Sequence, residues 1–220
     1  MSEVINNNPY ELFTALTNVL WALVAFISFI LISKNSNNSN SKAKLWKAVF
    51  VMLFVSNILA SLVHGLSIDI ETSELIWIPI NLILGLMIAL LMSAALYDYL
   101  GKDTMQKYFP YLIGVAVIFF AMTQFNRDTF LIFIAYQSIY MLLILTMYIH
   151  LAIKKHVGAG VICVGMFLFI LAAVAQAIGP YELALFIPIN QDGLYHLIGI
   201  PSTILLTIGV IKNLKNRNIE

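Results

Sequence analysis

The segment Gln191-Asp192-Gly193-Leu194-Tyr195-His196 opens the last long apolar run of the chain, which extends to about residue 211. A run of about 20 mainly apolar residues crosses a bilayer as one helix. In such a helix Asp192 and His196, four residues apart, lie on the same face. An ionisable side chain within the membrane costs about 2.5–3.5 kcal/mol even on insertion scales, so such residues usually serve a function. The segment therefore predicts a membrane-spanning helix with a functional polar face at its start.

The composition of the whole chain places this helix in a polytopic membrane protein. Of the 220 residues, 61% are hydrophobic and only 10% are charged, far fewer than in soluble domains. The formal net charge of +1 gives no electrostatic basis for binding nucleic acid, so we expect no nucleic-acid partner. The single cysteine, Cys163, excludes an intrachain disulfide.

Seven apolar runs are long enough to cross a bilayer, and they predict a single all-α membrane domain over residues 1–220. The expected transmembrane helices cover about residues 10–33, 44–66, 75–100, 108–125, 129–153, 157–178 and 193–211.

The loop charges predict the orientation, because cytoplasmic loops carry an excess of Lys and Arg. Basic residues occupy alternate loops and the tail: Lys34, Lys42, Lys44, Lys47, Lys102, Lys107, Lys154, Lys155, Lys212, Lys215 and Arg217. The opposite loops carry mainly acidic residues: Asp69, Glu71, Glu74, Asp128, Glu182 and Asp192, together with Arg127. We therefore expect an outer N-terminus and a cytoplasmic C-terminus. The short chain and its Asn/Ser-rich loop are compatible with a bacterial inner membrane.

In this topology, five ionisable residues from four helix ends lie at a similar depth near the outer face. They are Glu11, His64, Glu74, Asp192 and His196. Two imidazoles and a carboxylate suit Zn²⁺, and catalytic zinc takes three protein ligands and keeps a fourth position for water. We predict a zinc site with His64, Asp192 and His196 as its ligands.

Two polar stripes at helical spacing extend this cluster along the predicted helices. One contains Glu11, Thr14 and Asn18, and the other contains Asn57, Ser61 and His64. Polar stripes in membrane helices face protein or a wet cavity rather than lipid. We expect Ser61 to hydrogen-bond His64 or the zinc-bound water. We expect Asn18 and Asn57 to contact the metal-ligating side chains without binding the metal themselves.

Each of these residues also has a simpler structural interpretation. His64 could cap carbonyl groups at a helix end, and Glu11 and Glu74 could be first-turn carboxylates favoured by the helix dipole. Asp192 could be the N-cap of the last helix. The stripes could be ordinary hydrogen bonds between helices. His196 is hardest to explain in this way, because it follows within the first turns of an apolar helix.

Three short motifs carry a family resemblance. Glu11 and Asn18 form a Glu-x6-Asn pattern, Ser61-Leu62-Val63-His64 pairs a serine with a histidine, and Asp192-Gly193-Leu194-Tyr195-His196 places two potential ligands four residues apart. These motifs, in the first, second and seventh expected helices, resemble those of the CREST superfamily of membrane hydrolases. That superfamily includes alkaline ceramidases and the adiponectin and progestin receptors. Seven helices with an outer N-terminus are similar to the ceramidase branch.

The resemblance implies a zinc-dependent hydrolase that acts on a lipid amide or ester. His64 and His196 would bind the metal, and Ser61 would assist the bound water or the oxyanion. The superfamily also places an acidic residue in its third helix, for which Glu74 is the nearest candidate. Glu11 or Glu74 would act as a proton shuttle or as the partner of a ligating histidine.

The chain departs from the superfamily pattern in three places. Asp192 replaces the first histidine of His-x3-His, and Ser61 precedes His64 by three residues rather than four, so that Ala60 holds the family position. The segment 6–8 is Asn-Asn-Asn where ceramidases have an acidic calcium-binding segment. Ceramide is therefore not supported as the substrate.

Two alternatives to the hydrolase remain. The first, favoured by Asp192 in place of a histidine, is a receptor-like or ligand-binding seven-helix protein without catalysis. The second is a small transporter, which would use polar residues within the helices, namely Asn81, Gln124, Gln137 and Gln176. No charged relay crosses the expected bilayer, which disfavours the transporter.

Overall fold

The computed structural model describes residues 4–37, 39–125, 131–184 and 186–216, and seven helices within these ranges are each long and apolar enough to cross a membrane. They are α1 (Pro9–Lys34), α2 (Ser41–Gly65), α3 (Ile70–Leu100), α4 (Lys102–Phe125), α5 (Leu131–Ile153), α6 (Ala159–Ala177) and α7 (Gln191–Asn216). The prediction of an all-α, seven-helix integral membrane protein is confirmed. A short antiparallel hairpin, which the sequence did not indicate, precedes α7 and pairs β1 (Glu182–Ala184) with β2 (Pro188–Asn190).

Several helices extend beyond the apolar runs into polar sequence. α3 begins at Ile70 rather than near residue 75 because Asp69 caps it, with its carboxylate accepting from the Thr72 backbone N–H at 2.8 Å. α3 ends at Leu100 and is capped by Gly101, whose φ of 89° favours glycine, and α4 starts at Lys102. α7 likewise covers residues on both sides of the expected range 193–211. Arg127, Asp128, Thr129 and Arg217, which entered the loop and helix predictions, lie outside the described residues.

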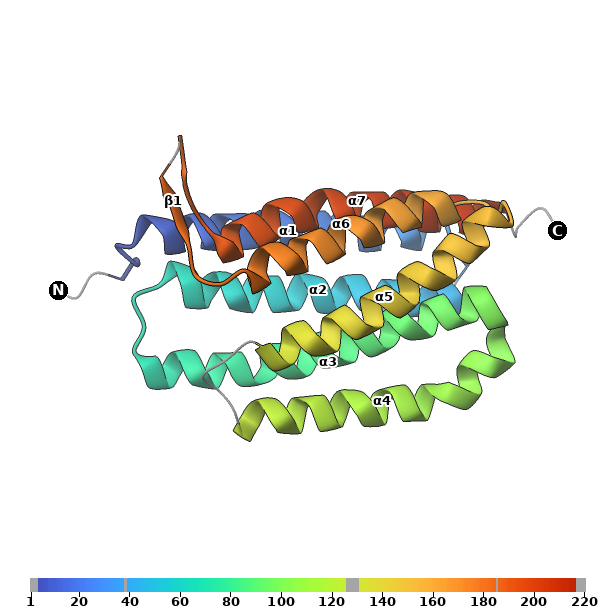
Figure 1. Ribbon diagram of the computed structural model, residues 1–220, viewed down its shortest axis with the longest axis horizontal. Coiled ribbons are helices and arrows are strands. Elements are labelled where there is room, and N and C mark those ends of the chain that lie inside the picture. The colour runs from blue at the N-terminus through green and yellow to red at the C-terminus, as the bar shows by residue number, and fades with distance from the viewer. Residues whose placement is uncertain (1–3, 38, 126–130, 185, 217–220) are drawn as a thin grey trace.

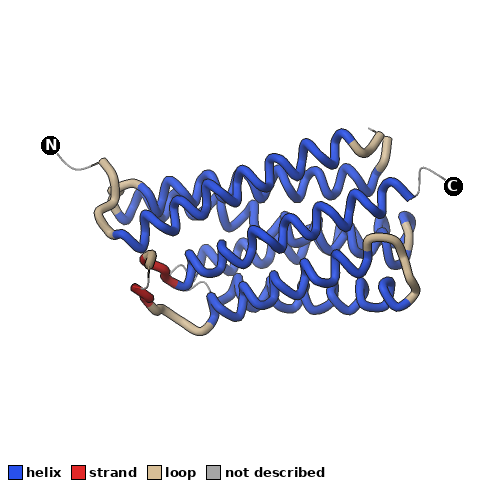
Figure 2. The backbone as a smooth tube through the Cα atoms, turned by 90° about the horizontal axis from the view of Figure 1, so that it is seen from above, coloured by secondary structure: helices blue, strands red, loops and turns tan. Residues whose placement is uncertain are grey.

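Six helices form a ring in which each contacts the next, in the order α1, α2, α3, α5, α6 and α7, with α7 returning to α1. α4 lies outside the ring against α3 (Figure 1) and is the least buried of the seven. The helices run along the long axis of the molecule (Figure 2), so their ends form two faces. The interior of the ring is therefore enclosed by six helices.

The ring closes tightly where α6 packs on α7. Gly158 precedes α6 with a φ of 83°, and a Cβ atom there would overlap the backbone carbonyl of Gly209. A Cβ atom on Gly209 would in turn overlap Ile162. Small residues that allow close backbone approach are typical of packed membrane helices.

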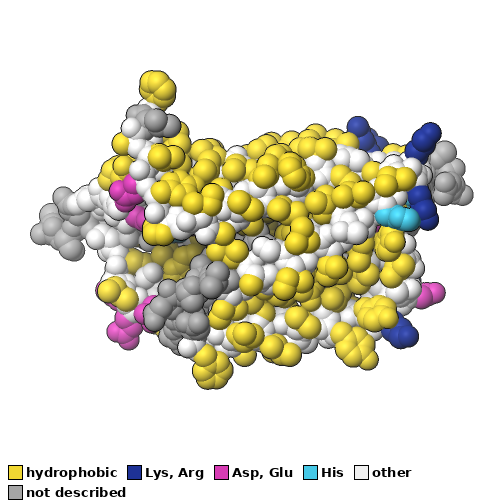
Figure 3. All heavy atoms as spheres, viewed as in Figure 1, with side chains coloured by type: hydrophobic (Ala, Val, Ile, Leu, Met, Phe, Trp, Pro, Cys, Tyr) yellow, Lys and Arg dark blue, Asp and Glu magenta, His cyan; other side chains and the backbone are white. Residues whose placement is uncertain are grey.

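The two ends of the bundle differ in charge. The hairpin end carries the start of α1, the end of α2, the start of α3 and the β1–β2 hairpin, whereas the tail end carries the end of α7. In Figure 3 the Lys and Arg side chains gather at the tail end, the Asp and Glu side chains lie mainly at the hairpin end, and hydrophobic side chains cover the surface between them.

One ionic cluster is buried at the tail end. The Lys42 ammonium lies 2.8 Å from a carboxylate oxygen of Asp98 and also donates to the Asn213 side chain. The Tyr148 hydroxyl donates to the other Asp98 oxygen at 2.9 Å. The Lys42 and Asp98 side chains are only 1% and 4% exposed. The assignment of Lys42 to a loop was therefore wrong: it belongs to α2, and this Lys42 cluster (Lys42, Asp98, Tyr148 and Asn213) joins α2, α3, α5 and α7.

Candidate functional site

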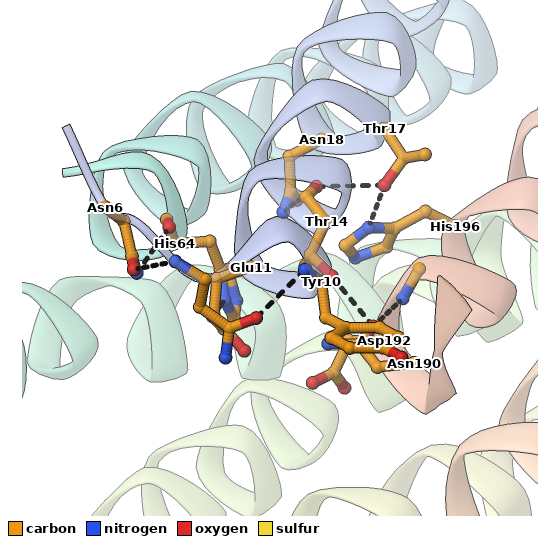
Figure 4. Close-up of polar contacts among 12 residues, drawn as sticks. Asn6, Tyr10, Glu11, Thr14, Thr17, Asn18, His64, Asn190, Asp192 and His196 are labelled. Atoms are coloured by element: carbon orange, nitrogen blue, oxygen red, sulfur yellow. Dashed lines mark hydrogen bonds and ion pairs between the residues drawn. The ribbon is translucent and has the colours of Figure 1, made fainter. Parts of the chain in front are cut away.

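The start of α1 supplies one wall of the candidate site. Asn8 caps the helix, with its side chain accepting from the Tyr10 backbone N–H at 2.9 Å, and Pro9 occupies the first turn. From this start, Glu11 faces α2, while Thr14, Thr17 and Asn18 are buried in the bundle. Figure 4 shows these side chains between α2 and α7.

Glu11 and His64 form the polar contact between α1 and α2. A carboxylate oxygen of Glu11 lies 2.6 Å from Nδ1 of His64, and the two side chains are 32% and 13% exposed, respectively. The Asn6 side chain donates to the His64 carbonyl at 3.1 Å and so holds the end of α2 against the N-terminal segment. Because the carboxylate occupies Nδ1, only Nε2 of His64 remains for another partner.

His196 is held in a similar way by α1. Its Nδ1 lies 2.9 Å from the Thr17 hydroxyl, and that hydroxyl donates its single hydrogen to the Thr14 carbonyl at 2.9 Å. While that hydroxyl donates to the Thr14 carbonyl, its oxygen is an acceptor for Nδ1–H of His196. In a neutral imidazole, Nε2 then carries the free lone pair. This contact, drawn in Figure 4, holds the ring against α1.

Asn190, not Asp192, caps α7. The Asn190 side-chain oxygen accepts from the Gly193 backbone N–H and from the Thr14 hydroxyl, each at 2.8 Å. The sequence-based alternative that Asp192 is the N-cap is therefore wrong. Asp192 instead lies in the first turn and accepts a hydrogen bond from the Gln176 amide at 3.0 Å, which links α7 to α6.

A cavity of about 540 Å³ opens inside the ring. Near the hairpin end it is lined by polar side chains: His64, Gln176, Asp192 and His196, with Asn18 and Asn57 further in. Its deeper lining is apolar: Leu53, Leu84, Met87 and Phe169. Leu53 precedes His64 by eleven residues on α2, which is about 16 Å along the helix axis. The titratable groups of the cavity thus lie near the hairpin end, beside apolar side chains such as Trp77 and Ile80, and the innermost lining is apolar.

The structure brings together most, but not all, of the predicted site residues. His64, Asp192, His196, Asn18 and Asn57 line the cavity, and Glu11 contacts His64. The hydroxyl of Ser61 instead donates to the Ile58 carbonyl of its own helix at 2.7 Å, and Glu74 is exposed near the start of α3. Neither is among the described residues that line the cavity.

Sequence reasoning missed two contacts near the cavity. Thr17 follows Thr14 by three residues and shares its buried face, which was the available signal for its role beside His196. Gln137 on α5 is only 2% exposed, and its oxygen lies 3.5 Å from the hydroxyl of Tyr195, which lines the cavity. Its amide nitrogen has no hydrogen-bond partner among the described residues.

The donor types, but not their arrangement, fit the predicted zinc centre. His64 and His196 both engage Nδ1 and leave Nε2, as metal-binding histidines do. Within the described ranges, however, no three His, Cys, Asp or Glu side chains lie close enough together to hold a metal ion. The site as it stands is a polar cavity wall rather than a closed metal centre.

The fold and the site define the class of this protein: an integral membrane protein of seven helices with an amphiphilic cavity at one end of the bundle. Within this class, the chain belongs to a family of unknown function (DUF6962), whose model matches residues 13–215. Neither the curated proteins nor the solved structures include a match to the chain.

Proposed function

We propose that the protein binds an amphiphilic, lipid-like molecule inside its helix ring. The observation that carries this proposal is the cavity, whose lining changes from His64, Asp192 and His196 at the hairpin end to Leu53 and Met87 in the bundle interior. Its volume of about 540 Å³ lies within the range of small-molecule sites. A polar head would lie near the hairpin end, and an apolar chain would fill the deeper part.

The polar wall favours a head group that donates hydrogen bonds. The geometry around Thr17 leaves Nε2 of His196 as an acceptor, and Asp192 supplies a carboxylate that accepts from Gln176 through one oxygen. An N–H or O–H group of the ligand is the complement of these acceptors. Fixed polar groups in a mainly apolar cavity provide orientation and specificity.

We also propose that the hairpin end faces outward and the tail end faces the cytoplasm. The concentration of lysines at the tail end, visible in Figure 3, supports this orientation through the positive-inside rule. The cavity would then take its ligand from the outer half of the membrane.

Binding can be tested with dibromostearamide, whose bromine atoms quench nearby tryptophans. Trp21 and Trp77 line the cavity, so quenching in lipid nanodiscs should saturate at a low mole fraction of the probe. The variant Leu84→Phe, which fills the cavity, should lose the saturable component. Leu142→Phe is the matched control, because Leu142 is 54% exposed on the outside of α5. Quenching that rises only linearly in the wild type, as for dissolved lipid, would reject the proposal.

A second candidate function is metal-dependent hydrolysis of a lipid amide or ester. It is favoured by the two imidazoles in the cavity, each held through Nδ1 by an oxygen from α1. Zinc would supply an activated water, with His64, Asp192 and His196 as its holders after they draw closer together. Elemental analysis decides between the candidates: about one zinc per chain, lost in His196→Ala, together with turnover of acyl amides, supports the hydrolase. Ligand binding by zinc-free protein without turnover supports a binding protein.

A further inference from the structure

Asp192 places a carboxylate in the cavity wall, and the described structure supplies no cation to balance it. It lines the cavity and accepts one hydrogen bond, from the Gln176 amide at 3.0 Å, through one of its two oxygens. Neither the Lys42 cluster nor the Glu11–His64 pair includes it. Among the described residues, its second oxygen therefore has neither a hydrogen-bond donor nor a cation as its partner.

The surroundings of Asp192 offer no other source of positive charge. The described residues that line the cavity include no lysine or arginine. The lysines gather instead at the tail end of the bundle, as Figure 3 shows. His64 is matched by the Glu11 carboxylate at 2.6 Å, so this pair leaves no surplus positive charge for Asp192. Because an anion is screened less in a mainly apolar cavity than in water, it attracts a cation more strongly there.

The rest of the cavity wall favours an organic cation over a metal ion. Within the described ranges, no three His, Cys, Asp or Glu side chains lie close enough together to hold a metal. Trp21, Trp77 and Tyr195 line the cavity, and the faces of aromatic rings attract organic cations. Tyr195 follows Asp192 by three residues on one face of α7, and its ring centroid is 5.4 Å from that of Trp21. The carboxylate and an aromatic pair thus occupy neighbouring parts of the wall.

We infer that the head group of the ligand is a cation, an amine or ammonium group that binds the carboxylate of Asp192. This inference rests on the proposed ligand-binding function and specifies its ligand class, a cationic amphiphile. A protonated amine carries N–H donors as well as charge, so it complements both the carboxylate and the acceptor Nε2 of His196. The apolar chain of the amphiphile lies against Leu53 and Met87 in the deeper part of the cavity.

Asp192→Asn separates this role from a structural one. The variant removes the charge, whereas its side-chain oxygen can still accept from Gln176 and so keep the link between α6 and α7. Glu71→Gln is the matched control. Glu71 also lies in the first turn of a helix at the hairpin end, but it is exposed and is not among the residues that line the cavity. Both variants remove one negative charge from a helix start, so a difference between them reflects the cavity.

The closing experiment is a competition in phosphatidylcholine nanodiscs at neutral pH. Bound dibromostearamide is displaced by stearylamine, whose head group is a cation, or by stearamide, which has the same chain and a neutral head group. In the wild type we expect stearylamine to compete about tenfold more strongly than stearamide. In Asp192→Asn the two lipids should compete within about twofold of each other, with stearamide affinity and the ligand-free melting temperature near wild type. Glu71→Gln should keep the wild-type preference.

Each other outcome overturns a distinct statement. Equal competition by the two lipids in the wild type would contradict a cationic head group and leave the proposed binding function standing. A preference that survives in Asp192→Asn, or that Glu71→Gln also abolishes, would remove Asp192 from head-group recognition. Loss of both lipids with a lowered melting temperature in Asp192→Asn would make Asp192 a structural link between α6 and α7. Absence of saturable quenching by dibromostearamide in the wild type would instead reject the proposed function, and this inference with it.

Discussion

Two regions of the bundle contain buried polar side chains, the Lys42 cluster at the tail end and the cavity wall at the hairpin end, and they satisfy these side chains in different ways. In the Lys42 cluster, a cation and an anion lie 2.8 Å apart, and Tyr148 and Asn213 add one hydrogen bond each. At the hairpin end, the polar groups are anchored on one side, as His196 is by Thr17, and face a cavity on the other. Of the two arrangements, the second opens onto a cavity with room for a ligand. Burial of charge alone therefore does not mark a functional site in this protein.

The largest effect on stability is expected from breaking the Lys42 cluster. Asp98→Ala leaves the Lys42 ammonium buried without its anion, which costs about 3–5 kcal/mol in comparable buried pairs. Thermal or denaturant unfolding in detergent measures the loss. Replacing both charges with apolar residues, in Lys42→Met with Asp98→Leu, should recover most of the stability. Lys44→Ala, at an exposed position two residues from Lys42, is the control and should have little effect.

A smaller effect is expected at the hairpin end from Thr17→Val. This change keeps the side-chain shape but leaves the Nδ1–H group of His196 without its acceptor, which costs about 1–3 kcal/mol. The imidazole would also be free to rotate, so affinity for dibromostearamide should fall. Thr17→Ser retains the hydroxyl and should keep both stability and affinity near wild type. If the valine and serine variants bind the probe equally well, the Thr17 contact does not orient the site.

The smallest effect is expected at the exposed cap of α3. Hydrogen bonds from the backbone and side chain of Thr72 lower the pKa of Asp69 from its usual 3.8. Because the folded-state pKa is the lower one, the charged cap stabilises the protein above pH 3.8, and that contribution disappears as the pH falls through the folded-state pKa. Asp69→Asn should flatten this part of the stability profile in a pH series of melting temperatures. A wild-type profile that Asp69→Asn leaves unchanged would assign the acid sensitivity to other groups.

The sequence predicted the helices and the depth of the site because both depend on one-dimensional patterns. Apolar runs of bilayer length predict spans, and alternating direction brings His64 and His196 to the same end of the bundle. The same patterns do not predict how each helix is rotated about its own axis, and therefore which side chains meet. Ser61 was therefore expected beside His64, whereas its hydroxyl bonds the Ile58 carbonyl within α2. The orientation of the termini and the zinc site stay predictions.

Tertiary contacts account for what the sequence did not reveal. Lys42 follows an Asn/Ser-rich loop, and a lysine there is normally solvated; only the approach of Asp98, more than fifty residues later, explains its burial. Asn190 caps α7 from the end of β2, and no apolar pattern in the sequence predicted that strand. Lys42 depends on a partner distant along the chain, and Asn190 is also held by the distant Thr14 hydroxyl of α1. Propensity and periodicity do not record such contacts.

The most direct test of the contrast between the two regions is the thermal shift produced by stearamide in three proteins. A ligand that binds the folded state raises its melting temperature. Stearamide should stabilise the wild type and the Lys42→Met, Asp98→Leu variant by similar amounts, because the Lys42 cluster takes no part in binding, and it should leave Leu84→Phe unchanged. An equal shift in Leu84→Phe, or loss of the shift in the double variant, would contradict the assignment of ligand binding to the cavity at the hairpin end.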